Sequence, residues 1–569
     1  MKQFFSVLFL LVTSYSQGQT DLELTYATFL GGSLEDSGSG IVFANDEKDR
    51  YVVFGNSASN DLPVTTNAYQ SELFGFSAGY FGLFSIEGDL EYASYLGANG
   101  QDIISSAAIG IQNRLILVGT TTSTDFPNVN PPAGSTGEGT SFITCFDGSF
   151  NLLWSTNFGG DDTDGIVDVQ TDSEGNIFIV GLTTSPDLGS DGVHTQNPNP
   201  GSDSDGFVAK LNSDGELLWY TYISGTGTSI AEQVVLSPDE STVYVSGSVE
   251  GGSDHGFLNS HQSIVGGSRD CVLLAYDASN GTMNWGTYYG GEGFESSTSI
   301  AVLENGQIVF SGTTDSDNSI SSIGSFQEDR AGGSDNFLAL FSPFGVRAWS
   351  TYFGGDGTEF DPNLNVAGDQ IYLNSSTSSS TGMTIGEPII DELSGSFVIA
   401  AFLCRFDDNG TPVWSTYVNE NYQCAGATSF EISGNASIYA TGTFNSNSTD
   451  PFCLDFVSPN AFQPSYAGGI SDFGIFHFEE NYLSTSFQNA EPLTIYPNPT
   501  RDFITIEAPN LLWAGMELTV TDFSGRQVDR VAQFQSGNSY STSHLSEGVY
   551  VLVGRYGERV FRDKLVVQR

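Results

Sequence analysis

The residues of this chain that could do chemistry are acids at one repeated position. Asp36, Asp102, Asp164, Glu295 and Glu359 each stand four residues after a Gly-Gly pair or its equivalent. Carboxylate oxygens are the hard ligands that Ca²⁺ prefers, so a ring of these side chains around a channel mouth would suit calcium. The alternative is structural: each carboxylate accepts backbone N–H bonds and fixes its own stretch of chain. Repetition in most repeats favours the structural role.

No catalytic motif accompanies these acids. The five histidines are His194, His255, His261, His477 and His544, and none falls in His-Glu-x-x-His. The chain has no Gly-x-Ser-x-Gly elbow, no P-loop and no dinucleotide fingerprint after a strand. His261 and His477 are expected to be packing residues. The sequence therefore predicts a protein that is not an enzyme and has no firmly implied cofactor, with Ca²⁺ left open.

The acids are positioned by a phrase that returns seven times. It reads Leu24-Thr-Tyr-Ala-Thr-Phe-Leu-Gly-Gly32 at first and Ala348-Trp-Ser-Thr-Tyr-Phe-Gly-Gly355 later. Its central hydroxyl residues lie 62 to 66 residues apart and are Thr28, Ser94, Thr156, Thr221, Thr287, Thr351 and Thr416. A fixed period indicates one structural unit that is copied, each copy burying its apolar face on the next.

One unit contains four short apolar segments separated by turns. In the first unit these are residues 41–43, 50–55, 80–85 and 90–96, with a long polar loop between the second and third. The pattern predicts an antiparallel meander of four strands. Trp154, Trp219, Trp285, Trp349 and Trp414 recur in register in the fourth segment, which indicates packing between units rather than a sugar platform.

Repeated four-stranded sheets can protect their edges by forming a radial ring. Residues 24–32 are a fourth strand without a preceding three, and the seventh unit lacks a fourth strand of its own. We therefore predict an all-β chain in which residues 19–480 form a seven-bladed β-propeller closed by the N-terminal strand. A linear solenoid is the alternative, and it would leave this strand without a partner.

The repeat phrase also carries a resemblance. Residues 26–32, followed by an acidic residue and by Asn67-Ala-Tyr-Gln70, resemble the bacterial SBBP family of seven-bladed propeller repeats. The second element recurs as Asn259-Ser-His-Gln262, Gly324-Ser-Phe-Gln327 and Asn460-Ala-Phe-Gln463. The resemblance covers residues 21–480 and implies secretion and surface display, with no settled activity.

A different module follows a predicted linker at residues 481–492. Residues 493–569 contain Tyr496-Pro-Asn-Pro499, Asp522-Phe-Ser-Gly-Arg526, Gly548-Val-Tyr550 and a basic, β-rich tail. Its short strands predict a small β-sandwich. In this order the motifs are similar to the type A sorting domain of the type IX secretion system. The resemblance implies that residues 493–569 engage that secretion machinery and that the linker is the region of cleavage.

The N-terminus and the cysteines bear on where the protein is located. Lys2 and the short apolar run from Phe4 to Val12 predict a secretory signal peptide at residues 1–18. No later apolar stretch is long enough to predict a transmembrane helix. Cys145, Cys271 and Cys404 fall in the third strand of different units and are expected in the core. Cys424 and Cys453 both fall in the seventh unit, which leaves a disulfide between them open.

Charge limits the partners. The 569 residues include 68 acids and 17 bases, a net charge of -51. Such a surface repels nucleic acids and anionic lipids, so neither is expected to bind. The leading hypothesis is a monomeric, secreted or surface-displayed binding or adhesion module for an extracellular protein or glycan. The alternatives are a secreted lyase or hydrolase with its site at the acidic channel mouth, and a structural matrix protein.

Overall fold

The computed structural model describes the chain from residue 20 onward, with gaps. The described residues are 20–132, 140–188, 193–194, 204–224, 227–251, 257, 260–386, 388–391, 393, 399–418, 426–433, 437–445, 457–458, 460–482, 491–498, 500–507, 515–522, 527–546, 548–556 and 559–567. The chain divides into two compact units, one of which is Leu22–Glu479 while the other includes Glu480–Arg569. The predicted signal peptide, Cys424 and Cys453 lie outside the described residues.

The described residues are all-β, as the sequence predicted, apart from the 3₁₀ turn η1 (Ile111–Asn113). Along Leu22–Glu479, antiparallel sheets of four strands repeat, each in chain order. They are β2 (Asp36–Phe43), β3 (Arg50–Ser57), β4 (Ala78–Ser85), β5 (Leu90–Leu96); β6 (Asp102–Gly110), β7 (Arg114–Thr121), β8 (Ser141–Phe146), β9 (Leu152–Phe158); β10 (Asp164–Thr171), β11 (Ile177–Thr183), β13 (Asp205–Leu211), β14 (Leu217–Ile223); β15 (Ser229–Leu236), β16 (Thr242–Glu250), β17 (Arg269–Asp277), β18 (Met283–Tyr289); β19 (Glu295–Val302), β20 (Ile308–Thr314), β21 (Asp335–Phe341), β22 (Arg347–Phe353); and β23 (Glu359–Ala367), β24 (Gln370–Thr377), β25 (Ala400–Phe406), β26 (Pro412–Tyr417). The short β12 (Val193–His194) adds in parallel to β14.

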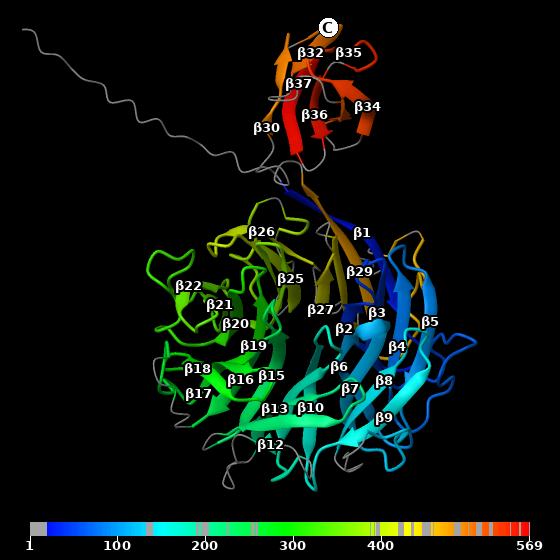
Figure 1. The fold of residues 1–569 in the computed structure, drawn as a ribbon, viewed down its shortest axis with the longest axis vertical. Coiled ribbons are helices and arrows are strands. Elements are labelled where there is room, and N and C mark those ends of the chain that lie inside the picture. Colours follow the sequence, from blue (N-terminus) through cyan, green and yellow to red (C-terminus); the bar gives the residue numbers. More distant parts are fainter. Residues whose placement is uncertain are drawn as a thin grey trace, which may run out of the picture. The chain divides into compact units, whose positions relative to one another are not determined.

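One further sheet joins the two ends of this unit. Its order is β1 (Thr20–Leu30), β29 (Ser471–Tyr482), β28 (Ser437–Asn445) and β27 (Gly426–Ile432). Figure 1 shows the blue β1 lying beside the orange β29, far from it in sequence. Each first strand contacts the first strand of the next sheet, in the order β2, β6, β10, β15, β19, β23 and β27, and β27 contacts β2 in turn.

The second strand of each sheet is buried on both faces. In β11, Ile177 and Ile179 belong to a core shared with β7, whereas Phe178 and Val180 belong to a core shared with β16. Successive side chains of a strand point to opposite faces, so a strand between two sheets must be apolar at every position. This explains why the second strands read as uninterrupted apolar runs.

The recurring aromatic residue of the fourth strand packs on the next sheet, which confirms the packing role predicted for the tryptophans. The indole N–H of Trp219 donates to the carbonyl of Ala278 at 3.2 Å, and Trp285 donates to Pro343 at 2.9 Å. The turn glycine Gly281 has φ of 71°, and a Cβ there would lie 2.6 Å from the Trp219 ring. The turn therefore needs glycine for its backbone and for the ring above it.

The C-terminal unit has two sheets with one hydrophobic core. The larger has the order β30 (Glu491–Pro492), β37 (Arg559–Val567), β36 (Gly548–Tyr556), β33 (Gly515–Asp522) and β34 (Gln527–Gln535). The smaller contains β31 (Thr494–Tyr496), β32 (Phe503–Glu507) and β35 (Ser539–Ser541). Ile504 and Ile506 from β32 share the core with Leu518 and Val520 from β33. The predicted linker, residues 481–492, contains the end of β29 and the short β30.

Candidate functional site

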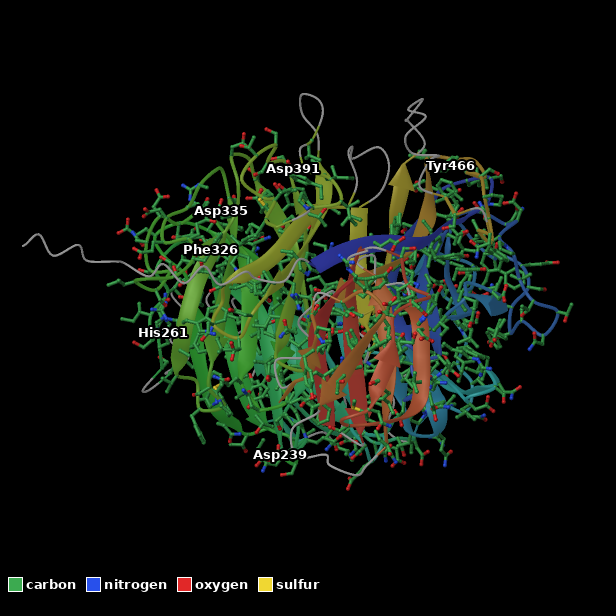
Figure 2. All side chains as sticks on the ribbon, turned by 90° about the horizontal axis from the view of Figure 1, so that it is seen from above. Asp239, His261, Phe326, Asp335, Asp391 and Tyr466 are labelled. Carbon is green, nitrogen blue, oxygen red and sulfur yellow. The ribbon has the colours of Figure 1, made fainter. Side chains whose placement is uncertain are left out.

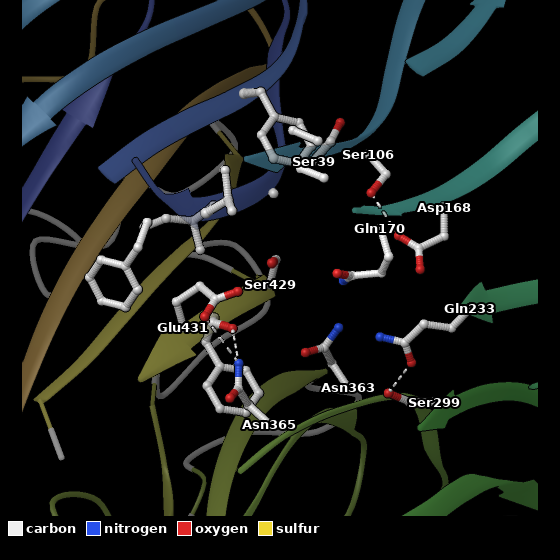
Figure 3. A pocket seen from close by; sticks show the side chains of 18 of the residues that line it. Ser39, Ser106, Asp168, Gln170, Gln233, Ser299, Asn363, Asn365, Ser429 and Glu431 are labelled. Atoms are coloured by element: carbon white, nitrogen blue, oxygen red, sulfur yellow. Dashed lines mark hydrogen bonds between the residues drawn. The ribbon is translucent and has the colours of Figure 1, made fainter. Parts of the chain in front are cut away.

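One cavity of the unit Leu22–Glu479 is lined by the first strands of its sheets. Residues of β2, β6, β10, β15, β19, β23 and β27 all line it, and its volume is about 470 Å³. Lys48, Asp46 and Asn45, from the turn after β2, contribute at one end. Figure 3 shows the polar side chains that project from these strands toward the centre. A cavity of this size can take a small molecule.

A β-bulge recurs in the first strand of every sheet that lines the cavity. The pairing register shifts between Gly38 and Gly40, Ile104 and Ser106, Ile166 and Asp168, Ala231 and Gln233, Ser296 and Ser299, Phe360 and Asn363, and Ala427 and Ser429. A bulge inserts extra residues and re-aims the side chains that follow it. The residue after each bulge is Gly40, Ser106, Asp168, Gln233, Ser299, Asn363 or Ser429, and all of them line the cavity.

Several of these polar side chains connect one sheet to the next. Asp168 accepts hydrogen bonds from the Ser106 hydroxyl at 2.7 Å and from the Val234 N–H at 3.0 Å. Gln233 likewise accepts from the Ser299 hydroxyl at 2.9 Å. Ser299 in turn accepts from the Leu364 N–H at 2.9 Å. Together these hydrogen bonds link β6, β10, β15, β19 and β23.

Four carboxylates line the cavity, those of Asp46, Asp168, Glu232 and Glu431. Burial raises the pKa of Asp168, Glu232 and Glu431. The pKa of Asp168 is raised, although the bonds from Val234 and Ser106 oppose the shift. The pKa of Glu232 is also raised, and this side chain accepts bonds from the Thr298 N–H and hydroxyl. The pKa of Glu431 is raised to about 7 despite the Lys48 ammonium nearby. These groups therefore hold protons more readily than exposed acids do.

Other polar groups in the cavity make no side-chain hydrogen bond to another residue drawn in Figure 3. Figure 3 shows the amides of Gln170, from β10, and Asn363, from β23, pointing toward the centre without a hydrogen bond between the residues drawn. The hydroxyl of Ser429, from β27, also faces the cavity. Each amide offers donors and an acceptor, so the pair can hold a ligand that both donates and accepts hydrogen bonds.

The five acids singled out in the sequence do not line this cavity. They are buried where one sheet passes to the next, and each accepts a backbone N–H from the residue four positions earlier. Each also accepts hydrogen bonds from two hydroxyls, one on the last residue of the second strand and one two residues later: Asp164 accepts from Thr183 at 2.5 Å and from Ser185 at 3.2 Å. This geometry favours the structural role over calcium binding.

Burial raises the pKa of most of these acids. The carboxyls of Asp36 and Asp164 have raised pKa values, and those of Glu295 and Glu359 are raised to about 7. Asp270 adds to the shift of Glu295, and Asp335 adds to that of Glu359, because each is a second buried carboxylate close by. In the fourth repeat Ser229 takes the equivalent position and is also buried. Within the described ranges, no group of three or more His, Cys, Asp or Glu residues could hold a metal ion.

The Asn-Ala-Tyr-Gln element ties the long loop to the repeat phrase. The Gln262 N–H donates to the Thr287 hydroxyl at 2.9 Å, and its side-chain carbonyl accepts the Gly290 N–H at 3.0 Å. Gln463 makes the same two bonds with Thr28 and Gly31 of the N-terminal strand, at 2.9 and 3.1 Å. The same pair of bonds that holds the loop to the fourth strand within a repeat thus also connects Gln463 to the N-terminal strand.

His261, His477 and the described cysteines are packed as predicted. His261 lies 5.8 Å from the Tyr289 ring and 6.0 Å from the Phe341 ring, measured between centroids. Figure 2 labels His261 together with Phe326, which takes the same position in the neighbouring sheet. His477 stacks on Tyr439 at 4.3 Å. Cys145, Cys271 and Cys404 are buried and free.

The C-terminal unit matches a known family. Residues 494–568 match the family of secretion system C-terminal sorting domains. The chain therefore carries a sorting domain of the type IX secretion system, which indicates a secreted or cell-surface protein. In the part of the chain that the structure describes, no helix has the length and apolar character needed to cross a bilayer. No curated protein is significantly similar to the chain in sequence.

The fold is similar to several solved structures at low identity. A fungal alcohol oxidase of the AA5 family, in complex with copper, is 11% identical with a TM-score of 0.39, over 96% of this chain and 99% of that one. A protein of unknown function from Dyadobacter fermentans is 8% identical with a TM-score of 0.38, over 81% and 99%. The phage phi92 endosialidase is 11% identical with a TM-score of 0.34, over 96% and 88%. Scores this low assign no activity.

Sequence reasoning missed the cavity residues Gln170 and Asn363. The available signal was a polar residue inside an otherwise apolar first strand, as in Ile166-Val-Asp-Val-Gln170. Strict alternation does not predict which of these residues face inward, because the bulge shifts the register.

Proposed function

We propose that residues 22–479 form a closed seven-bladed β-propeller and that the exported protein is an extracellular binding module. Two contacts at the chain ends support closure. Gln463 bonds to Thr28 and Gly31 as Gln262 bonds to Thr287 and Gly290. Tyr26 takes the place of the recurring tryptophan, and its hydroxyl donates to the Gly88 carbonyl of the next sheet at 3.2 Å.

The observation that carries the binding function is the shared cavity. The first strand of each repeated sheet contributes to it, and two amides that bond to none of the residues drawn in Figure 3 face its centre. A small ligand could therefore contact several blades at once, and the rigid sheets would hold its binding groups in place. We propose the cavity, rather than the five buried acids, as the ligand site.

The sorting domain supports the extracellular setting of this function. It fits a signal peptide at residues 1–18, export by the type IX machinery, and display or release outside the cell. The resemblance of the repeats to the SBBP family agrees with surface display. We further propose that the exported protein is a monomer that serves in adhesion or capture of an extracellular molecule.

A secreted enzyme is the second candidate, and one observation favours it. Glu431 lines the cavity with a pKa raised to about 7, a value that suits a general acid. We favour binding because the cavity acids that join neighbouring sheets, Asp168 and Glu232, accept hydrogen bonds from protein donors. Turnover of a saccharide that Glu431→Gln abolishes, with the fold intact, would support the enzyme instead.

A cavity-filling variant tests the proposed function. Ser429→Phe should block the cavity, and we expect full-length protein with this change to lose binding to immobilised extracellular polysaccharides and glycan arrays. Ser149→Phe is the matched control, because Ser149 lies on an exposed turn and the same side chain there should leave binding unchanged. Equal binding by wild type and Ser429→Phe, with matching circular dichroism, would place the ligand site elsewhere.

A further inference from the structure

Two of the four carboxylates of the cavity, those of Asp168 and Glu232, are committed to bonds within the protein. Asp168 uses one oxygen for Ser106 and the other for Val234. Glu232 uses one oxygen for Ser248, at 3.2 Å, and the other for the N–H and hydroxyl of Thr298. A ligand that relied on a carboxylate partner would have to compete with bonds that join neighbouring sheets.

The labelled groups that face the centre in Figure 3 without a bond to another residue drawn there are neutral. Gln170 and Asn363 present amides, and Ser429 presents a hydroxyl. The strands β10 and β23 are separated by β15 and β19 on one side of the circuit of first strands, and by β27, β2 and β6 on the other. The two amides therefore approach the centre from different walls of the cavity, as Figure 3 shows, and a ligand between them would be held from both sides.

The surrounding charge disfavours an anion. The protein has a net charge of -51, and four carboxylates line the cavity against one lysine, Lys48, at its end. An anionic ligand would meet repulsion from both sources. A cation would gain little from Asp168 and Glu232, because their pKa values are raised and their oxygens already accept bonds.

We infer that the cavity binds a neutral polyhydroxylated ligand of mono- or disaccharide size, held between the Gln170 amide of β10 and the Asn363 amide of β23. This inference rests on the proposed function and names the chemistry of its ligand. A side-chain amide can donate to one hydroxyl and accept from the next, which suits vicinal hydroxyl groups. A cavity of about 470 Å³ lies in the range that small ligands occupy.

The test is isothermal titration of the full-length protein with three sets of probes. Galactose, mannose, lactose and cellobiose are the neutral set, glucuronate is the anionic probe, and putrescine is the cationic probe. We expect at least one neutral sugar to bind and the other two probes not to bind. Gln170→Leu and Asn363→Leu should each weaken that binding by about 10-fold, because each leaves a ligand hydroxyl unpaired.

Gln101→Leu is the matched control, since Gln101 is exposed and lies outside the cavity. Unfolding temperatures without ligand identify a variant that fails to fold, and Asn363→Asp then serves as a milder change at the same position. Binding of glucuronate or putrescine that Ser429→Phe blocks would overturn the inference while leaving the cavity as a ligand site. Sugar binding that neither amide variant changes would also overturn it. If no neutral sugar binds at millimolar concentration, the inference fails.

Discussion

The threonine and the two glycines of the repeat phrase each have an identifiable contact. The central threonine accepts the N–H of the loop glutamine, as Thr287 does from Gln262. The first glycine donates to the side chain of that glutamine, and the second glycine donates to the acid four residues later. These glycines lie so close to buried carboxylates that a Cβ on Gly290 would be 2.3 Å from Glu295. The phrase therefore holds the fourth strand to the neighbouring loops through hydrogen bonds.

The first prediction concerns the hydrogen bonds that Asp164 accepts. Asp164→Ala would leave the Gly160 N–H and the hydroxyls of Thr183 and Ser185 without their acceptor. We expect a loss of about 2–4 kcal/mol in the free energy of unfolding, measured by urea denaturation. Chelation with EDTA or addition of Ca²⁺ should leave the unfolding temperature of the wild type unchanged. A calcium-dependent rise that Asp164→Ala removes would instead support the metal role.

At the scale of elements, the N-terminal strand contributes both an edge and a core. Phe29 packs in the core of the sheet formed with β27, β28 and β29, whereas Leu30 packs with residues of β2, β3 and β4. The backbone N–H of Ala27 donates to the Ser458 hydroxyl at 2.9 Å. A strand with these contacts pairs with the edge of β29 and packs in the hydrophobic cores on both of its faces.

The second prediction follows from this placement. Deletion of residues 20–30 should expose the edge of β29 and cause the protein to oligomerise or aggregate, as size-exclusion chromatography would show. A synthetic peptide with the sequence of residues 20–30 should restore the monomer, while a scrambled peptide should not. A truncated protein that stays monomeric with an unchanged unfolding temperature would contradict the closed ring.

At the scale of the whole molecule, buried acids with raised pKa values are spread over several sheets. Glu295, Glu359, Glu431 and Asp472 each have a pKa of about 7, with burial as the largest cause. A folded-state pKa above that of the unfolded chain means that the folded state binds the proton more tightly. The stability that these groups contribute is therefore present below about pH 4 and is lost as the pH rises through 7. The net charge of -51 acts in the same direction, since repulsion grows as the acids ionise.

The third prediction is that the unfolding temperature is higher at pH 5 than at pH 8. Asp472→Asn isolates one contributor, because Asp472 accepts the Ala467 N–H through one oxygen and has no partner for the other. We expect this variant to unfold about 1–3 °C above the wild type at pH 8 and to show a weaker pH dependence. Asp335→Asn is the control: both oxygens of Asp335 accept bonds, so this change should destabilise at every pH. A wild type that is equally stable at pH 5 and pH 8 would contradict the prediction.

The sequence by itself determined the repeating unit, its four strands and the secretion module. Period, apolar runs and turn glycines are local properties, and each repeat restates them. The packing roles of Trp219, His261 and Cys271 followed from their recurrence at equivalent positions.

Only the tertiary structure decided which polar residues share one cavity. Gln170 and Asn363 are almost two hundred residues apart in the sequence, and they line one cavity because the first strand of each repeated sheet contributes to its wall. The bulge in each first strand also shifts the alternation of inward and outward side chains, so periodicity alone does not assign their direction. The tertiary structure also places the cavity acids, such as Asp168, apart from the five acids that are buried where one sheet passes to the next.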